Sequence, residues 1–326
     1  MAKPRVGFLG TGWIGRHRME AMIATGGIDA AAIADPSDEM AAEALKAAPG
    51  AARVDGLEEL LALGLDGVVI ATPSAMHAEQ SIRAHEAGAA VFCQKPLGRT
   101  AAEAQAVVEA ARTADRLLAV DFSYRFTDGM RRIRELAAGG ALGRIYAVDL
   151  VFHNAYGPDK AWFYDPALSG GGCVMDLGVH LVDLALWALD FPEVGAVSSQ
   201  LVAAGEPLSE GRVEDYAAAS FELEGGTAVR LACSWRLQAG QDAVISAAFY
   251  GTEGGAALRN LGGSFYDFEA ELYRGTARET LSSPPDDWGG RAAADWARRL
   301  AAGERFDPQA ERLVEVARVL DRIYGR

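Results

Sequence analysis

A glycine-rich segment near the middle of the chain carries an aspartate and a histidine four residues apart. It runs from Ser169 through three glycines to Asp176, Gly178 and His180. On a helix this spacing places the two side chains on one face, and a histidine oriented by a carboxylate can accept a proton near neutral pH. Gly178 would allow a ligand or another backbone to come close. The segment is a candidate for acid–base catalysis, although a lone histidine is more often a packing or capping residue.

Metal binding is the less favoured interpretation of the same segment. Asp176, His180 and Asp183 carry possible ligand atoms, but no convincing further ligand accompanies them. The three cysteines of the chain form no CxxC pair, so a structural zinc site is not indicated either. We therefore expect no metal site.

A second candidate site lies near the N-terminus, where the chain matches the pattern GxGxxG. Alone the pattern is weak, because the chain contains 37 glycines. Here it follows an apolar strand expected at 5–9, opens a helix, and precedes an acid, Asp35, at the end of the next strand. This context is typical of a dinucleotide-binding loop, whose glycines admit the pyrophosphate to the helix N-terminus. The alternative is a glycine-rich turn without a ligand. The loop consists of Gly10, Thr11, Gly12, Trp13, Ile14 and Gly15.

The identity of the dinucleotide depends on Asp35. Its carboxylate would bind the adenosine ribose hydroxyls. The next residues, Pro36, Ser37 and Asp38, include no cation that could pair with a 2′-phosphate. NAD is therefore expected in preference to NADP, unless Asp35 merely caps the helix that follows.

A lysine forms the third candidate site. The run Gln94-Lys95-Pro96 follows the strand expected at 89–93. Ligands of open α/β sheets bind at the carboxyl ends of the strands. A lysine is usually a surface residue, but this location makes Lys95 a candidate for ligand binding.

Two domains are expected to position these residues. Up to residue 124, short apolar runs alternate with helical segments, which predicts a doubly wound parallel sheet, the Rossmann fold. Further on, the strands expected at 215–223, 227–235 and 243–250 are separated by glycine-rich turns, as in an antiparallel sheet. We predict an α/β chain: a Rossmann domain at 1–124, then an α+β domain at 125–326 with a large, mostly antiparallel open sheet.

Charge and composition narrow the classes of partner. The formal net charge is −14, so nucleic acid and anionic membranes are disfavoured partners. No apolar run is expected to approach the roughly 20 residues that span a bilayer. The N-terminal segment is too short for the core of a signal peptide. An odd, low number of cysteines indicates reduced thiols, so we expect a cytoplasmic location.

At these motifs the chain resembles the Gfo/Idh/MocA family, named after glucose–fructose oxidoreductase, inositol dehydrogenase and a rhizopine-catabolism protein. The resemblance covers essentially the whole chain. It implies a nicotinamide-dependent enzyme that oxidises a secondary alcohol of a sugar or cyclitol, or reduces the matching ketone. The motifs that carry it are GTGWIG, Ala71-Thr72-Pro73 with His77, Gln94-Lys95-Pro96 and SGGGCVMDLGVH.

The resemblance implies Lys95, Asp176 and His180 as catalytic residues. Besides the glycine loop, Asp35 and Lys95, the implied cofactor contacts are Ala71, Thr72, Pro73, His77, Gln94, Trp162 and Phe163, to which we add Trp288. Substrate candidates besides the catalytic three are Tyr124, Arg125, His153, Asn154, Tyr156, Lys160 and Trp162. Two positions depart from the family pattern. Gln94 replaces the usual glutamate beside Lys95, and Phe163 replaces a common arginine near the nicotinamide.

In the expected mechanism the cofactor carries the hydride and the protein moves the proton. His180 would be the general base in oxidation, Lys95 would stabilise alkoxide character, and Asp176 would orient His180 or bind a neighbouring hydroxyl. Two alternatives remain: a glycosidase that uses tightly held NAD for transient oxidation, and a non-catalytic dinucleotide-sensing regulator. A pure sensor would not need the three proton-handling residues.

The expected antiparallel sheet also predicts self-association. One face of the sheet must pack against helices, and the other face must be polar or covered by a partner. Relatives commonly associate in this way, so we expect a homodimer or homotetramer through the C-terminal sheet. The alternating apolar positions are Ala217, Ala219, Phe221, Leu223, Val229, Leu231, Cys233 and Trp235.

Overall fold

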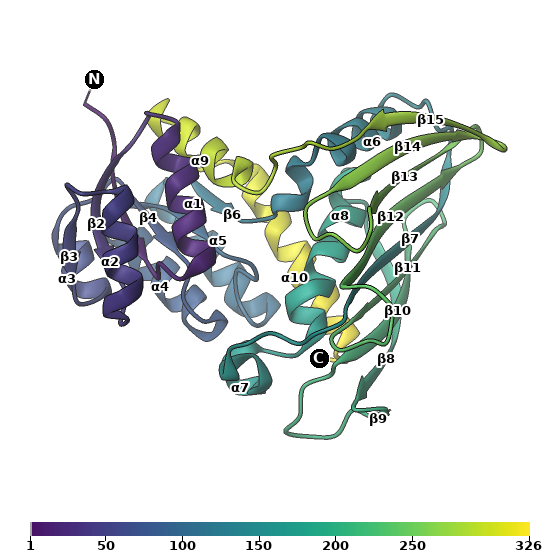
Figure 1. Ribbon diagram of the computed structural model, residues 1–326, viewed down its shortest axis with the longest axis horizontal. Helices are drawn as coiled ribbons and strands as arrows, with labels where there is room; N and C mark the ends of the chain where they lie inside the picture. Colours follow the sequence, from purple (N-terminus) through teal and green to yellow (C-terminus); the bar gives the residue numbers. More distant parts are fainter. Residues whose placement is uncertain (1) are drawn as a thin grey trace. The chain divides into compact units, whose positions relative to one another are not determined.

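The computed structural model describes residues 2–326, and the chain divides into two compact units (Figure 1). The first unit comprises the residues up to 121 together with 290–314. The second comprises 122–289 together with 315–326. The sequence suggested a single crossing after residue 124, whereas the chain returns to the first unit near its end.

The first unit contains a six-stranded parallel sheet with the order β3-β2-β1-β4-β5-β6. The order reverses between β1 and β4, and ligands of such sheets bind beyond the carboxyl ends of the strands at this switch point. The Rossmann-type fold expected from the sequence is confirmed. The strands are β1 (Arg5–Leu9), β2 (Asp29–Ala34), β3 (Ala52–Val54), β4 (Gly67–Ile70), β5 (Ala90–Cys93) and β6 (Leu118–Val120).

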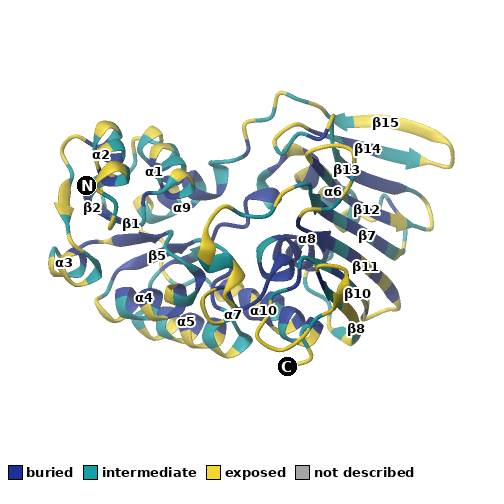
Figure 2. Cartoon of the chain, turned by 60° about the horizontal axis from the view of Figure 1, so that its bottom comes forward, coloured by how far each residue is buried: buried dark blue, intermediate teal, exposed yellow. Residues whose placement is uncertain are grey.

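Five helices connect these strands. Strands β4 and β5 are buried along their whole length (Figure 2), as continuous apolar runs predict for a sheet covered on both faces. The sequence analysis missed β3 and α3, because both are short and lack a clear apolar period. The helices are α1 (Trp13–Ala24), α2 (Asp38–Ala47), α3 (Leu57–Ala62), α4 (Ser74–Glu86) and α5 (Ala101–Ala114).

Helix α9 (Arg291–Ala301) also belongs to the first unit, where it packs against α1 and β5. Its anchor is the buried Trp296, whose ring centroid lies 5.9 Å from that of Phe92. Gly67 makes room for this indole, since a Cβ there would lie 2.8 Å from the ring. The apolar period of the segment predicts a helix but not which unit it joins. A 3-10 turn, η4 (Pro308–Glu311), follows.

The second unit contains a nine-stranded sheet with the order β15-β14-β13-β12-β7-β11-β10-β8-β9. All neighbouring pairs are antiparallel except β7 and β11, which run parallel. The expected large, mostly antiparallel sheet is confirmed. The strands are β7 (Ile145–Asn154), β8 (Val194–Ala203), β9 (Glu206–Pro207), β10 (Tyr216–Leu223), β11 (Thr227–Ser234), β12 (Ala243–Gly251), β13 (Gly255–Asn260), β14 (Phe268–Arg274) and β15 (Ala277–Ser282).

Helices cover one face of this sheet, as Figures 1 and 2 show. Helix α8 (Val179–Ala188) packs on β7 and β11, and α6 (Asp128–Ala138) packs on β13 to β15. Along β10, Phe221 and Leu223 are buried whereas Ser220 and Glu222 are exposed. The remaining helical elements here are η1 (Ser123–Phe126), η2 (Ala161–Tyr164), α7 (Pro166–Ser169), the π-helical turn η3 (Val174–Gly178) and α10 (Arg312–Ile323).

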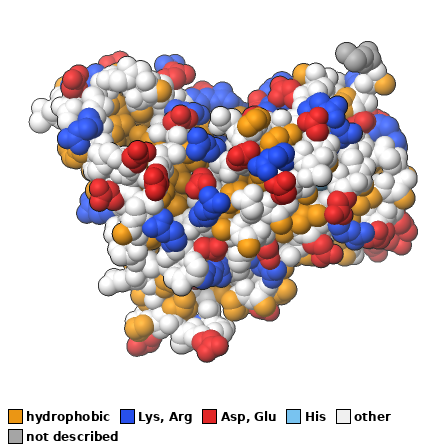
Figure 3. Space-filling model, turned by 180° about the vertical axis from the view of Figure 1, so that it is seen from behind, with side chains coloured by type: hydrophobic (Ala, Val, Ile, Leu, Met, Phe, Trp, Pro, Cys, Tyr) orange, Lys and Arg blue, Asp and Glu red, His pale blue; other side chains and the backbone are white. Residues whose placement is uncertain are grey.

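One helical run, Pro166–Ala188, has the length and apolar composition that a membrane span requires. The expectation that no run would reach this length was therefore wrong. However, 89% of its most apolar window is buried inside the protein. Because the run ends in α8, which packs on β7 and β11, its hydrophobicity is explained by core packing. On the face drawn in Figure 3, acidic and basic side chains are interspersed, not gathered into a patch of one sign.

Candidate active site

The glycine loop of the first unit has the backbone geometry that a pyrophosphate requires. Gly10 has φ +84°, and a Cβ there would lie 2.6 Å from the carbonyl oxygen of Ala71. A Cβ at Gly15 would lie 2.1 Å from the carbonyl oxygen of Gly10. A Cβ at Gly12 would meet nothing within 4 Å. The first and third glycines are thus required by packing, and the second leaves open space for a ligand at the start of α1. Trp13 is exposed and stacks on the ring of His17.

Asp35 is bound to this loop. Its Oδ2 accepts hydrogen bonds from the backbone N–H of Thr11 at 2.6 Å and from the Thr11 hydroxyl at 3.2 Å. Its Oδ1 accepts from the N–H of Ser37, which is the N-cap of α2. Asp35 therefore joins the glycine loop to the start of α2, a structural role that sequence reasoning had allowed only in part.

The loop after β4 is held by an interior histidine. His77 is buried, with Nδ1 2.7 Å from the carbonyl oxygen of Pro96 and Nε2 2.7 Å from that of Thr72. Burial lowers the pKa of His77, partly offset by these two carbonyls. The Thr72 hydroxyl donates to Gln80 Oε1 at 2.6 Å. His77 thus connects the loop that contains Pro73 with the loop that contains Lys95.

In the second unit the predicted Asp–His segment begins with a π-helical turn. Asp176 lies within η3, whereas His180 lies in the first turn of α8. The wider turn changes the angle between the two side chains from the one that a continuous α-helix would give. Such turns are frequent at functional sites. Asp176 Oδ2 accepts a hydrogen bond of 3.1 Å from the indole N–H of Trp235, a residue just after β11 that the sequence analysis did not place in the site.

The glycines before this turn are required by the close approach of Tyr324 and of the Glu214 backbone. A Cβ at Gly171 would lie 2.0 Å from the hydroxyl of Tyr324, and one at Gly172 would lie 1.9 Å from the carbonyl oxygen of Glu214. The Glu214 carboxylate is fully buried and accepts hydrogen bonds from the N–H groups of Gly172 and Val174 and from the Tyr324 hydroxyl. Glu214 therefore caps the helical run, and the glycines admit this cap. No local pattern in the sequence indicates this role.

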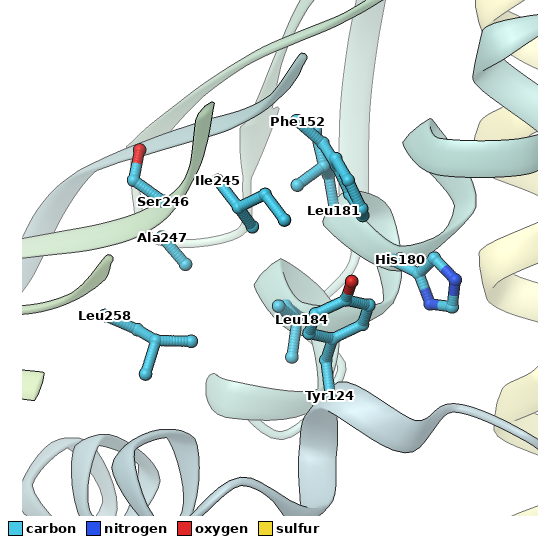
Figure 4. A pocket seen from close by; sticks show the side chains of 9 residues that line it. All are labelled: Tyr124, Phe152, His180, Leu181, Leu184, Ile245, Ser246, Ala247 and Leu258. Atoms are coloured by element: carbon cyan, nitrogen blue, oxygen red, sulfur yellow. The ribbon is translucent and has the colours of Figure 1, made fainter. Parts of the chain in front are cut away.

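His180 packs in an aromatic cluster. Its ring centroid lies 4.9 Å from that of Tyr124, edge to face, and 6.3 Å from that of Phe152. Figure 4 shows the His180 ring beside the Tyr124 ring at one end of a small pocket. Because the rest of the lining is almost wholly apolar, this pocket suits core packing better than a polyol. The other lining residues are Leu181, Leu184, Ile245, Ser246, Ala247 and Leu258.

Aromatic side chains gather near Asp176. The rings of Trp162 and Phe163 stack with centroids 3.8 Å apart, and Phe163 meets Trp235 edge to face at 6.3 Å. Tyr164 also contacts Trp235, at 5.6 Å between centroids. These faces can pack on the C–H surface of a sugar ring. Among the predicted substrate residues, Asn154 has a buried side-chain oxygen with no hydrogen-bond partner, which a ligand hydroxyl could satisfy.

The structure assigns two predicted site residues to packing within the second unit. Arg125 forms a bidentate ion pair with the buried Asp183, which accounts for the charge of both side chains within the unit. Burial raises the pKa of Asp183 against the effect of Arg125. Trp288 is buried beside Tyr124 and donates to the carbonyl oxygen of Tyr266 at 3.0 Å. The sequence shows the polarity of Arg125 and the aromaticity of Trp288, but not these partners.

The three remaining substrate candidates differ in their surroundings. His153 stacks on Tyr216 and bonds Ser234 at 2.8 Å, on the sheet face opposite to Phe152. Burial lowers the pKa of His153. Tyr156 is half exposed, and Lys160 pairs with its neighbour Asp159. Among residues 2–326 no group of three or more His, Cys, Asp or Glu side chains could hold a metal ion.

A parallel sheet with an open glycine loop at its switch point, joined to a unit that carries an Asp–His segment, defines a dinucleotide-binding oxidoreductase. Residues 4–122 match a family described as "Oxidoreductase family, NAD-binding Rossmann fold", and residues 130–257 match the "GFO/IDH/MocA C-terminal domain". The chain belongs to the GFO/IDH/MocA family. It is accordingly an NAD(P)-dependent oxidoreductase that acts on CH–OH groups.

Similar proteins include enzymes that act on sugars. D-glucoside 3-dehydrogenase of Escherichia coli (strain K12) is 30% identical over 259 residues, which are 76% of this chain and 70% of that one. The structure of GenD2 from gentamicin A biosynthesis, solved with NAD, has a TM-score of 0.83 at 26% identity and covers 100% of this chain and 94% of its own. A 3-ketoreductase from Actinomadura kijaniata, solved with NADP and TDP-benzene, has a TM-score of 0.85 at 21% identity, with coverages of 99% and 98%.

Proposed function

We propose that the protein transfers a hydride between NAD and a secondary alcohol, or the matching ketone, of a sugar, sugar derivative or cyclitol. The observation that carries the proposal is the fixed carboxylate of Asp176, held by Trp235 among aromatic rings and four residues before His180. Aromatic faces and a fixed acceptor are what recognition of a polyol requires. The names of relatives that act on glucosides and inositols support the same class of substrate.

Each of the three proton-handling residues has a proposed role. His180 takes the hydroxyl proton in oxidation and returns it in reduction. Lys95 donates to the reacting oxygen and stabilises alkoxide character. Asp176 orients His180 or accepts from a neighbouring substrate hydroxyl. The nicotinamide, when bound, supplies the hydride chemistry.

The proposed cofactor is NAD in preference to NADP. Asp35 presents a carboxylate beside the glycine loop, where a 2′-phosphate would be repelled. One cation that the sequence analysis overlooked lies on the neighbouring strand: Arg53 of β3 forms an ion pair with Asp38. Because Asp38 already pairs with this guanidinium, we propose that Arg53 does not reverse the preference.

Two proposals concern the state of the protein in the cell. We propose a cytoplasmic location, in line with the three free cysteines.

We also propose self-association through the uncovered face of the nine-stranded sheet. Along β10 and β11, residues of this face alternate with the buried residues that the helices cover. Light scattering at micromolar concentration should show a dimer or tetramer, and a strict monomer would refute the proposed association.

The proposed function is tested by a screen of sugars and cyclitols, in both oxidation states, with NAD and NADP. We expect absorbance of reduced cofactor to appear with NAD and a free polyol, or to disappear with the matching ketone. Hydrolysis of a glycoside without net formation of NADH would instead support the glycosidase. Tight dinucleotide binding without turnover of any polyol would support the regulator.

A further inference from the structure

The first unit contains a buried carboxylate to which no role was assigned from sequence. Asp121 directly follows β6, and its side chain is 2% exposed. Its Oδ2 accepts a hydrogen bond of 2.6 Å from Arg18 Nε, on α1, and one of 2.8 Å from Gln94 Nε2, just after β5. Strands β5 and β6 are neighbours in the sheet, so residues 94 and 121 meet at the same carboxyl edge.

This contact fixes the orientation of the Gln94 carboxamide. An ionised carboxylate only accepts hydrogen bonds, so the group that faces Asp121 must be the NH₂ of the amide. The other end of the amide, Oε1, makes no hydrogen bond to the described part of the chain. Gln94 therefore presents a neutral acceptor at the edge where the cofactor site is proposed.

The same contact explains why a glutamine suits this position. A glutamate at 94 would bring a second carboxylate to hydrogen-bond distance of Asp121. Arg18, which donates to Asp121, would then face two negative charges. Two carboxylates so close cannot both ionise without penalty. No further donor offsets this penalty at Asp121, because its Oδ1 is buried without any hydrogen-bond partner.

We propose that Asp121 is a positioning residue for the cofactor: it orients Gln94 so that Oε1 accepts from a hydroxyl donor of the bound dinucleotide. Position 94 carries a neutral amide, and the negative charge beside it is carried by Asp121, one strand away and paired with Arg18. The inference rests on the proposed contact between Gln94 and the cofactor. It adds that residues 94 and 121 act as one unit with a single negative charge.

The test is an exchange of amide and acid between the two positions. Wild type, Gln94→Glu, Asp121→Asn and the double variant are compared by the NAD dissociation constant, measured by titration in the absence of substrate, and by thermal melting. We expect Gln94→Glu to weaken NAD binding about tenfold or more at pH 8, and Asp121→Asn to weaken it several-fold because the amide loses its orientation. The double variant should return to within about threefold of wild type. In it, the amide introduced at position 121 donates to the carboxylate introduced at position 94, and its oxygen accepts from Arg18.

A pH series separates positioning from a purely structural role. In Gln94→Glu, a proton shared by the two carboxylates restores a donor between them, so NAD binding should strengthen as the pH falls from 8 to 5.5. Wild type and the double variant should lack this trend. The matched control is Gln80→Glu, at a buried glutamine of α4 whose oxygen accepts from Thr72. Any defect in that variant should not be relieved by Asp121→Asn.

The outcomes are distinguishable. A wild type that binds no NAD would refute the proposed function itself. If wild type binds NAD and Gln94→Ala binds it equally well, the Gln94 contact is wrong. If Gln94→Ala weakens binding but Gln94→Glu matches wild type at every pH, or if the double variant shows the sum of the single defects, the orienting role of Asp121 is overturned. Should Gln94→Glu fail to fold, equal NAD affinity in wild type and Asp121→Asn would overturn it as well.

Discussion

The indole N–H of Trp235 donates to Asp176 Oδ2 at 3.1 Å, and this bond crosses from the end of β11 to the π-helical turn before α8. Trp235 is buried, and its ring also meets Phe163 and Tyr164. The tryptophan therefore holds the carboxylate and forms part of the aromatic wall beside it. A hydrogen bond to a charged acceptor contributes about 1.5–3 kcal/mol, so the Trp235 donor helps to fix the orientation of Asp176.

Replacing Trp235 by phenylalanine should keep the aromatic packing and remove the donor. We expect kcat/KM to fall about 10- to 100-fold, the range that 1.5–3 kcal/mol converts to. The pH profile of kcat/KM should also shift, because a carboxylate that loses a donor becomes more basic. Steady-state kinetics across pH on a variant with unchanged NAD affinity checks this. An unchanged pH profile would mean that Trp235 contributes only packing at this position.

Glu214 provides a prediction about stability. Burial raises the pKa of Glu214 above its ordinary value, against the lowering effect of its hydrogen bonds to Val174 and Tyr324. An acid with a raised pKa in the folded state destabilises the fold as the pH rises from its unfolded pKa through its folded one. Relative to Glu214→Gln, the wild type should therefore gain melting temperature as the pH is lowered from 7 towards 5.

The same variant tests the positioning of the Asp–His segment. An amide at position 214 retains only one acceptor oxygen for the N–H groups of Gly172 and Val174, so Glu214→Gln should lower kcat while NAD binding in the first unit stays unchanged. Tyr324→Phe is the matched control, since it removes one donor to Glu214 and leaves both N–H bonds in place. If the melting-temperature difference between wild type and Glu214→Gln does not vary with pH, the assignment of a raised pKa is wrong.

Cofactor choice should respond to changes at the end of β2. Asp35→Ser combined with Pro36→Arg should move the preference towards NADP, because the carboxylate is removed and a guanidinium can pair with the 2′-phosphate. Part of the loss in NAD affinity will arise because Asp35→Ser removes the hydrogen bonds that the carboxylate accepts from Thr11. The ratio of kcat/KM for the two cofactors is the measurement. A wild type that already prefers NADP would contradict the role given to Asp35.

Local features of the fold could be predicted from the sequence, whereas contacts between distant residues could not. In the first unit, the apolar runs and the glycine spacing predict the parallel sheet and the loop, because each signal is local. The partner of each polar side chain is not local. Trp235 and Asp176 are 59 residues apart, and Glu214 and Tyr324 are 110 apart. The sequence therefore marked Asp176 as a candidate but could not name what holds it, and it placed Arg125 in the site although that residue pairs with Asp183.

Lys95 and His180 are proposed to act on one oxygen and its proton, so their effects should not add. Lys95→Ala should reduce kcat heavily, because alkoxide character would develop without a cation. The double variant Lys95→Ala/His180→Ala should be little worse than the more severe single variant. Single-turnover rates with pre-bound NAD give this comparison. Fully multiplicative losses would show that the two residues act on separate steps.

The most direct test of the proposed acid–base role of His180 is the turnover of His180→Ala with the substrate that the screen identifies. We predict that kcat falls about 10²- to 10⁴-fold, the range for losing a positioned general acid–base. The NAD dissociation constant should stay near the wild-type value, because the glycine loop lies in the first unit and His180 in the second. The melting temperature should fall, because truncation of the buried ring leaves a cavity beside Tyr124, so kcat is measured well below the melting temperature of the variant. A folded His180→Ala protein with near-wild-type kcat would contradict the central claim, and the Asp–His segment would then serve only the packing of α8 against Tyr124.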